Sequence, residues 1–198
     1  MIPIAWDWNI VAWPSQFLAI PVAALDIAEP IQPSPKATPE QLRAIMRNVP
    51  EIYNRLASGL TPTDFQRMGT SPLNQREQEI AETYKHLYST SNHAERLEAE
   101  FVDGQGIIVT KGRHRVDAAR QIGLPYVPVH LRARDQETLA RLSSRMEAEV
   151  SSMQPTAVDA HRTIDSMHRQ SRGEPVVIQA EKTLEREPGI DRMTGCGR

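Results

Sequence analysis

Residues 107–131 have the sequence IIVTKGRHRVDAARQIGLPYVPVHL, and this stretch decides the fold we expect. Ile107–Thr110 is a short apolar run typical of a buried strand, and Val127–Leu131 is a second one. Between them, Gly112–Ile122 has the composition of a helix, and Gly123 stands where a helix commonly ends. The stretch therefore predicts a strand–helix–strand unit, in which we expect the two strands to run parallel.

The start of this helix concentrates positive charge. Lys111, Arg113, His114 and Arg115 surround Gly112, although the whole chain carries a formal net charge of -2. Cationic side chains so close together repel one another unless an anion lies among them. The first N–H groups of a helix have no partner within the helix and attract anions, and glycine lets a ligand approach the backbone closely. The sequence therefore predicts a phosphate site at this helix start.

A solvent-exposed helix with ordinary ion pairs is the alternative interpretation. Arg113 and Asp117 lie on one face, where they can pair with each other. Arg115 precedes Ala118 and Ile122 by three and seven positions, which places it beside the apolar face. A half-buried arginine needs either a carboxylate or a phosphate as its partner. Spacing alone leaves both interpretations open.

Length and composition bound the rest of the chain. Its 198 residues fit one domain with tails, and its small net charge argues against a protein that coats DNA or membranes through bulk charge. The only cysteine, Cys196, cannot form an internal disulfide, which indicates a reducing, cytoplasmic setting. Prolines and polar residues interrupt the apolar N-terminus, which lacks the basic residues of a targeting signal. We expect an N-terminal arm over 1–16, a single domain over 17–170 and a flexible tail over 171–198.

Helices are expected on both sides of the strand–helix–strand unit. Thr38-Pro39-Glu40 has the residues that cap a helix, and the helix predicted over 41–56 has a break at Pro50. The remaining predictions are a strand over 17–25, a loop over 61–72, a helix over 74–100 interrupted at 89–93, a tight turn at 103–106, and helices over 135–153 and 155–168.

The opening stretch resembles the core of the ParB/sulfiredoxin superfamily. In that family a strand leads into a G-x-x-R-x-x-A helix, a glycine-led turn and a V-P-V strand. Gly112, Arg115 and Ala118 stand at the three motif positions, and Val127-Pro128-Val129 stands at the strand. The resemblance implies an α+β fold, with a small mixed sheet packed against helices and with extra N-terminal helices in this chain.

The resemblance also implies a nucleotide site. The residues predicted to bind phosphate are Lys111, Gly112, Arg113, His114 and Arg115, with ATP as the nucleotide and Mg²⁺ as the metal. His114 and Arg115 are also predicted to be catalytic. Sulfiredoxins carry their catalytic cysteine where this chain has Arg113, which argues against sulfinic-acid reduction.

Two acids outside the motif are candidate metal ligands. Asp103 could hold magnesium or activate water, and it is the third predicted catalytic residue. The alternative is that Asp103, which precedes Gly104, only stabilises the turn, where aspartate is common. In the family, a glutamate–asparagine pair lies on the next helix, and this chain matches that pair poorly. Glu147 stands at about its place and could bind the metal. The alternative is that Glu147 is simply an exposed acid on a helix.

In size and layout the chain is similar to the plasmid oncogenic-suppression proteins, which are fertility-inhibition factors. That likeness implies ATPase and DNase activity and a block of conjugative or T-DNA transfer through type IV secretion. The implied partners are DNA and either the secretion coupling protein or the transferred nucleoprotein. A nucleotide-gated adaptor of the DNA-partition type and a non-catalytic inhibitor of the secretion machinery are the alternatives.

Three histidines have two interpretations each. His161 and His168 are seven residues apart, too far to chelate a metal alone, and a solvated helix face is the simpler explanation. His130 lies in the predicted strand and points either towards the nucleotide or into the structure.

Overall fold

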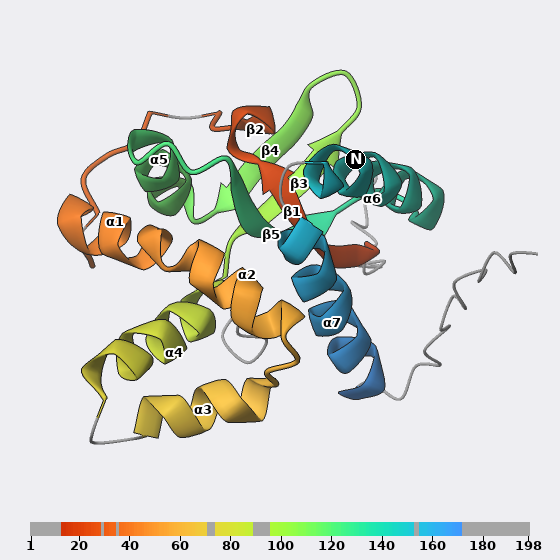
Figure 1. Ribbon diagram of the computed structural model, residues 1–198. Helices are drawn as coiled ribbons and strands as arrows, with labels where there is room; N and C mark the ends of the chain where they lie inside the picture. The colour runs from red at the N-terminus through yellow and green to blue at the C-terminus, as the bar shows by residue number, and fades with distance from the viewer. Residues whose placement is uncertain are drawn as a thin grey trace, which may run out of the picture.

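The computed structural model describes residues 13–28, 30–34, 36–70, 74–88, 96–152 and 155–171. Their strands are β1 (Ser15–Pro21), β2 (Leu25–Asp26), β3 (Glu98–Val102), β4 (Gly106–Lys111) and β5 (Tyr126–Arg132), and a 3-10 turn, η1 (Val22–Ala24), follows β1. Their helices are α1 (Pro39–Arg47), α2 (Val49–Ala57), α3 (Pro62–Thr70), α4 (Gln75–Tyr88), α5 (Arg113–Gln121), α6 (Gln136–Ser151) and α7 (Pro155–Ser171). The α+β class is confirmed, and α1 to α4 are the extra helices that precede the core hairpin (Figure 1).

The strands form one mixed sheet in the order β1-β5-β3-β4-β2. β3 pairs with β4 antiparallel and with β5 parallel, so β4 and β5 run in opposite directions with β3 between them. The predicted parallel pair was therefore wrong. The tight turn after Val102 joins β3 and β4 as a hairpin, and a hairpin makes its two strands antiparallel neighbours. β5 then takes the other edge of β3.

The first helix begins and ends close to the predicted positions. The Thr38 hydroxyl accepts a hydrogen bond from the backbone N–H of Gln41, and the Gln41 side chain accepts one from the N–H of Thr38. This capping box satisfies two N–H groups that the helix itself leaves without acceptors. Asn48 rather than Pro50 separates α1 from α2, because Pro50 lies in the first turn of α2, where its missing N–H costs nothing.

The predicted loop over 61–72 was wrong, because α3 occupies most of it. The N–H and the hydroxyl of Thr61 both donate to the Asp64 carboxylate, at 2.8 and 2.6 Å. Pro62 stands at the first helical position, where proline is favoured rather than disruptive. The buried ring of Phe65 stacks on Tyr84 of α4 with the centroids 4.1 Å apart. Tertiary packing thus stabilises a helix in a segment whose prolines and glycine are typical of a loop.

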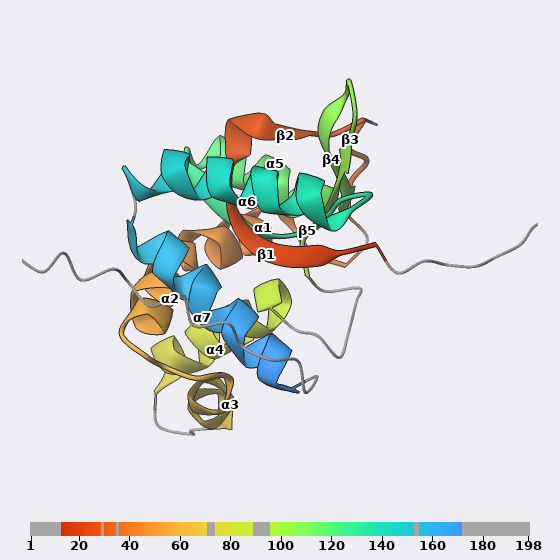
Figure 2. The ribbon, with the colours of Figure 1, turned by 90° about the vertical axis from the view of Figure 1, so that its right-hand side faces the viewer.

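The helices surround the sheet in pairs. α6 and α7 pack against β1, and α7 also runs along α2 (Figure 2). α1 packs against α5, and α3 packs against α4.

No helix among the described residues is long and apolar enough to cross a membrane. Residues 1–12 and 172–198, which include nearly all of the predicted arm and tail, lie outside the described residues.

His161 is a core residue rather than part of a solvated face. Its Nδ1 lies 2.6 Å from the carbonyl oxygen of Ala157, and its Nε2 lies 3.3 Å from the hydroxyl of Tyr88. Burial lowers the pKa of His161 to about 4, so the imidazole is neutral at pH 7. The side chain of His168 is not among those described. His130 lies on β5, where its ring contacts Phe17 with the centroids 4.9 Å apart.

Candidate functional site

Gly112 fixes the turn from β4 into α5. Its φ of 85° lies in the left-handed region, which glycine adopts without strain. A Cβ at this position would lie 2.3 Å from Cδ2 of Leu97 and 3.1 Å from a guanidinium nitrogen of Arg115. Both backbone conformation and packing therefore require glycine. Since glycine has no side chain, the first turn of α5 has no side-chain cap.

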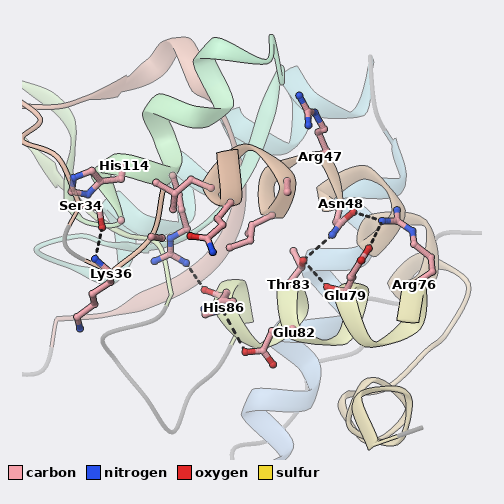
Figure 3. Close-up of a pocket in the computed structure, with 17 residues that line it drawn as sticks. Ser34, Lys36, Arg47, Asn48, Arg76, Glu79, Glu82, Thr83, His86 and His114 are labelled. Atoms are coloured by element: carbon pink, nitrogen blue, oxygen red, sulfur yellow. Dashed lines mark hydrogen bonds and ion pairs between the residues drawn. The ribbon is translucent and has the colours of Figure 1, made fainter. Parts of the chain in front are cut away.

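The start of α5 lines a cleft of about 1040 Å³ (Figure 3). Its walls come from α1, α4, α5 and the segment that precedes α1. A volume of this size is typical of small-molecule sites. The charged or titratable lining residues are Lys36, Arg47, Arg76, Glu79, Glu82, His86, His114 and Arg115.

Arg115 is the buried arginine of this cleft. The residue is only 8% exposed, and its Nη1 donates a hydrogen bond to the backbone carbonyl of His86. His86 lies in the last turn of α4. Arg115 therefore joins α4 to α5 in addition to lining the cleft, and the sequence-based placement beside the apolar face is confirmed.

His114 links α5 to the proline-containing segment before α1. Its Nε2 lies 2.6 Å from the backbone carbonyl oxygen of Gln32, with the imidazole N–H as the donor. The half-buried imidazole lines the cleft. Of the five predicted phosphate ligands, Gly112, His114 and Arg115 thus meet at the cleft.

Lys111 belongs to a different group of charges. Its Nζ lies 3.3 Å from Oε2 of Glu98, a residue only 2% exposed. Arg96 donates from Nε to Oε1 of Glu98 at 2.8 Å, and Arg132 approaches Oε2 to 3.3 Å. We call these four residues the Glu98 cluster. Burial by itself raises the pKa of Glu98, but the hydrogen bond from Arg96 and the charges of Arg96, Arg132 and Lys111 lower it on balance.

The other predicted site residues do not line the cleft. Arg113 is half-buried and is not a lining residue. Asp103 lies in the exposed turn before β4, whereas Gly112 follows the other end of that strand, so the two ends are roughly 20 Å apart at strand spacing. Glu147 is on α6, where Oε2 lies 2.8 Å from Nη2 of Arg162.

These positions bear directly on the expected magnesium ion. Neither Asp103 nor Glu147 lines the cleft, so neither fits a magnesium ion bound to phosphates there. Glu79 and Glu82 do line it, and Oε2 of Glu79 lies 3.5 Å from Arg76. Within the described ranges, no three His, Cys, Asp or Glu side chains are grouped closely enough to hold a metal.

The sequence pattern missed an ordered polar wall formed by α4 and by Asn48, which lies between α1 and α2. The amide of Asn48 donates to Oγ1 of Thr83 at 3.0 Å, and its Oδ1 accepts from Arg76 at 2.7 Å. Arg76 also donates to Glu51 at 2.7 Å, and this hydrogen bond raises the pKa of Arg76. Figure 3 shows the part of this network formed by Asn48, Thr83 and Arg76 as connected side chains on one wall of the cleft.

Lys36 and Arg47 are the other cations that the sequence analysis missed. Both line the cleft, and neither forms an ion pair with any residue that the structure describes. In Figure 3 the Arg47 side chain stands apart from the network around Asn48. No local motif marks either residue, because only the fold brings them to the cleft.

Comparisons with known proteins give one match. No family model matches the chain, and no curated protein matches it either. Among solved structures, it matches the C-terminally truncated chromosome-partitioning protein ParB from Caulobacter crescentus complexed with CTP-gamma-S. The match has 13% sequence identity and a TM-score of 0.28, and covers 80% of this chain and 79% of that chain. The matched protein is of the superfamily that the sequence resembles, but a TM-score of 0.28 is too low to carry an argument about fold or ligand.

Proposed function

We propose that the protein binds a nucleotide in the cleft, with the phosphates at the start of α5. One observation carries the proposal. Lys36 and Arg47, which are distant in sequence from the motif, line the same cleft as Gly112 and Arg115. An ordinary amphipathic helix with internal ion pairs gives no reason for cations of other segments to line a cleft beside it.

The charge of the cleft supports a phosphate ligand. Four lysine or arginine side chains and two glutamates line it, so the formal lining charge is 4 − 2 = +2 with neutral histidines. Arginine donates paired hydrogen bonds that match phosphate oxygens, and lysine adds a compact charge. The first turn of α5 has no side-chain cap, and the positive end of its dipole favours an anion near Gly112.

Hydrolysis of ATP is the finer part of the proposal. The cleft supplies positioning and charge stabilisation, which dominate phosphoryl transfer. His114, like His86, is a lining residue suited to move a proton, and it is the one at the start of α5. When bound, Mg²⁺ would neutralise phosphate charge, and the proposal gives Asp103 and Glu147 no part in holding it. DNA cleavage and inhibition of transfer through type IV secretion stay predictions from the family resemblance.

The test of binding is calorimetric titration of the purified chain with ATP and with CTP, with and without Mg²⁺. Replacing Arg47 by alanine should weaken ATP binding about tenfold, equivalent to about 1.4 kcal/mol, because an uncompensated cation is lost from the cleft. Lys36→Ala combined with Arg47→Ala should weaken it further.

Arg67→Ala is the matched control, because Arg67 is an exposed arginine of α3 that does not line the cleft. Its ATP affinity should equal that of the unaltered chain. Unchanged affinity in the double variant, or no binding of either nucleotide to the unaltered chain, would remove the proposal.

Turnover separates an enzyme from a nucleotide-gated adaptor. Phosphate release from ATP and nicking of supercoiled plasmid should be followed in the unaltered chain and in His114→Gln, which keeps an N–H donor towards Gln32. Loss of release with retained ATP binding assigns His114 to catalysis. Binding of ATP or CTP without phosphate release from the unaltered chain would indicate the adaptor instead.

A further inference from the structure

A second cavity of about 560 Å³ adjoins the cleft, and we call it the side lobe. The two cavities share the lining residues Ser34, Lys36, Ala37, Gln41, Leu42 and His114. His114 therefore lies at the boundary between them. Its hydrogen bond to the Gln32 carbonyl holds the segment before α1 against α5 at that boundary.

The lining of the side lobe differs from that of the cleft. Outside the shared boundary, the described lining is formed by Ile31, Gln32, Pro33, Thr38, Pro39, Asp117, Ala118 and Gln121. Asp117 is the one charged residue in that set. Lys36 and His114 line the side lobe only at the shared boundary; beyond it, a carboxylate among apolar groups and neutral amides repels phosphate and accepts hydrogen bonds from hydroxyl groups.

A chain of hydrogen bonds holds the Asp117 carboxylate in place. Gln121 donates from Nε2 to Oδ2 of Asp117 at 2.8 Å. Arg43 of α1 donates from Nη1 to Oε1 of Gln121 at 2.7 Å, which fixes the amide orientation. This chain of hydrogen bonds orders the carboxylate before any ligand arrives, so little side-chain entropy is lost when it binds one.

We infer that the side lobe takes the nucleoside part of the nucleotide, with Asp117 accepting a hydrogen bond from a sugar hydroxyl. The inference rests on the proposed function, since it needs phosphates in the adjoining cleft. Asp117 follows His114 by three residues, so it lies one helical turn further from the boundary. The sugar is the part of a nucleotide next to the phosphates, and the base then lies among Ile31, Pro33 and Ala118.

The experiment compares ATP, 2′,3′-dideoxy-ATP and inorganic tripolyphosphate as ligands of the full chain by calorimetry. The unaltered chain should bind ATP at least tenfold more tightly than either of the other two. Asp117→Ala should bind ATP about tenfold more weakly, should no longer distinguish ATP from dideoxy-ATP, and should bind tripolyphosphate unchanged or more tightly. Asp159→Ala, which removes an exposed acid of α7, is the matched control and should change none of these affinities.

The outcomes distinguish failure of the nucleoside site in the side lobe from failure of the phosphate site in the cleft. If the unaltered chain binds tripolyphosphate as tightly as ATP, or if Asp117→Ala weakens both equally, the side lobe does not hold the nucleoside and the phosphate cleft stands. If no ligand binds, the proposed function fails together with this inference. Ile31→Trp fills the side lobe from an exposed position and is the second variant: it should weaken ATP but not tripolyphosphate, and equal weakening would overturn the inference.

Discussion

Two neighbouring regions of this molecule differ in how their positive charges are compensated. In the Glu98 cluster, three cations surround one buried carboxylate of the protein. In the cleft, four lysine or arginine side chains face two glutamates, and two of the cations have no ion pair with the residues described. The first region contains its own anion, whereas the second has a formal excess of charge that a phosphate ligand would neutralise.

The basic stretch Lys111–Arg115 supplies both regions. Lys111 is the last residue of β4 and the cross-strand partner of Glu98, so the sheet directs its side chain towards that carboxylate. At Gly112 the backbone turns through a left-handed conformation, and His114 and Arg115 then line the cleft. The end of a strand and the start of a helix therefore divide one basic run between structure and binding.

Glu98→Gln should have the largest effect on the first region. The substitution leaves Arg96, whose side chain is only 6% exposed, without the carboxylate that compensates its charge. Breaking a buried pair in this way costs about 3–5 kcal/mol, and the partly exposed Lys111 and Arg132 favour the lower end. Urea unfolding at pH 7 measures the loss of unfolding free energy. A loss below about 1 kcal/mol would show that the cluster is not a stabilising unit.

The pH dependence provides the control for Glu98→Gln. The pKa of Glu98 is lowered in the folded chain, so its contribution is present above the unfolded pKa and is lost as the pH falls through the folded pKa. The difference in stability between the unaltered chain and Glu98→Gln should therefore shrink on acidification. ATP affinity of the folded variant at pH 7 should stay unchanged if the two regions are separate.

Gly112→Ala should have the next largest effect, and it acts on the second region. A left-handed conformation costs an alanine about 1–2 kcal/mol, and a contact of 2.3 Å with Leu97 forces a shift that adds about 1 kcal/mol or more. We expect a loss of about 2–3 kcal/mol in unfolding free energy, together with weaker ATP binding, because the start of α5 moves.

Gly104→Ala is the matched control for Gly112→Ala. Gly104 also has a positive φ, 78°, but a Cβ there would meet nothing within 4 Å. Its loss should be about 1–2 kcal/mol from the backbone alone, with no change in ATP affinity. Equal losses in the two variants would contradict a role for close packing at Gly112.

Local signals explain what the sequence predicted correctly. The tight turn at 103–106, α5 with its glycines, β5 and the Thr38 cap each depend on residues within a few positions of one another. The placement of Arg115 beside the apolar face follows from helical spacing alone, and the structure confirms it. Such features are determined by backbone geometry and pattern, which a single sequence carries.

Long-range pairing explains what the sequence could not show. Residues 74–100 were predicted as largely helical, so Glu98 was not recognised as a strand residue opposite Lys111. Lys111 was then assigned to phosphate because it adjoins the motif. Arg47 and Arg76 reach the cleft only because α1 and α4 fold beside α5, and no spacing within their own helices distinguishes them from ordinary surface arginines.

Lys111→Ala should have the smallest effect. Comparing this variant with Arg47→Ala is the most direct test of the difference between the two regions. The Lys111 side chain is 42% exposed, so its ion pair with Glu98 should contribute less than about 1 kcal/mol to unfolding free energy. Because Lys111 does not line the cleft, its loss should leave ATP affinity unchanged, whereas Arg47→Ala should weaken ATP binding with little change in stability. Urea unfolding and calorimetry on both variants measure the two quantities. If Lys111→Ala weakens ATP binding as much as Arg47→Ala does, the ligand bridges both regions, and the carboxylate of Glu98 then competes with phosphate for the same cation.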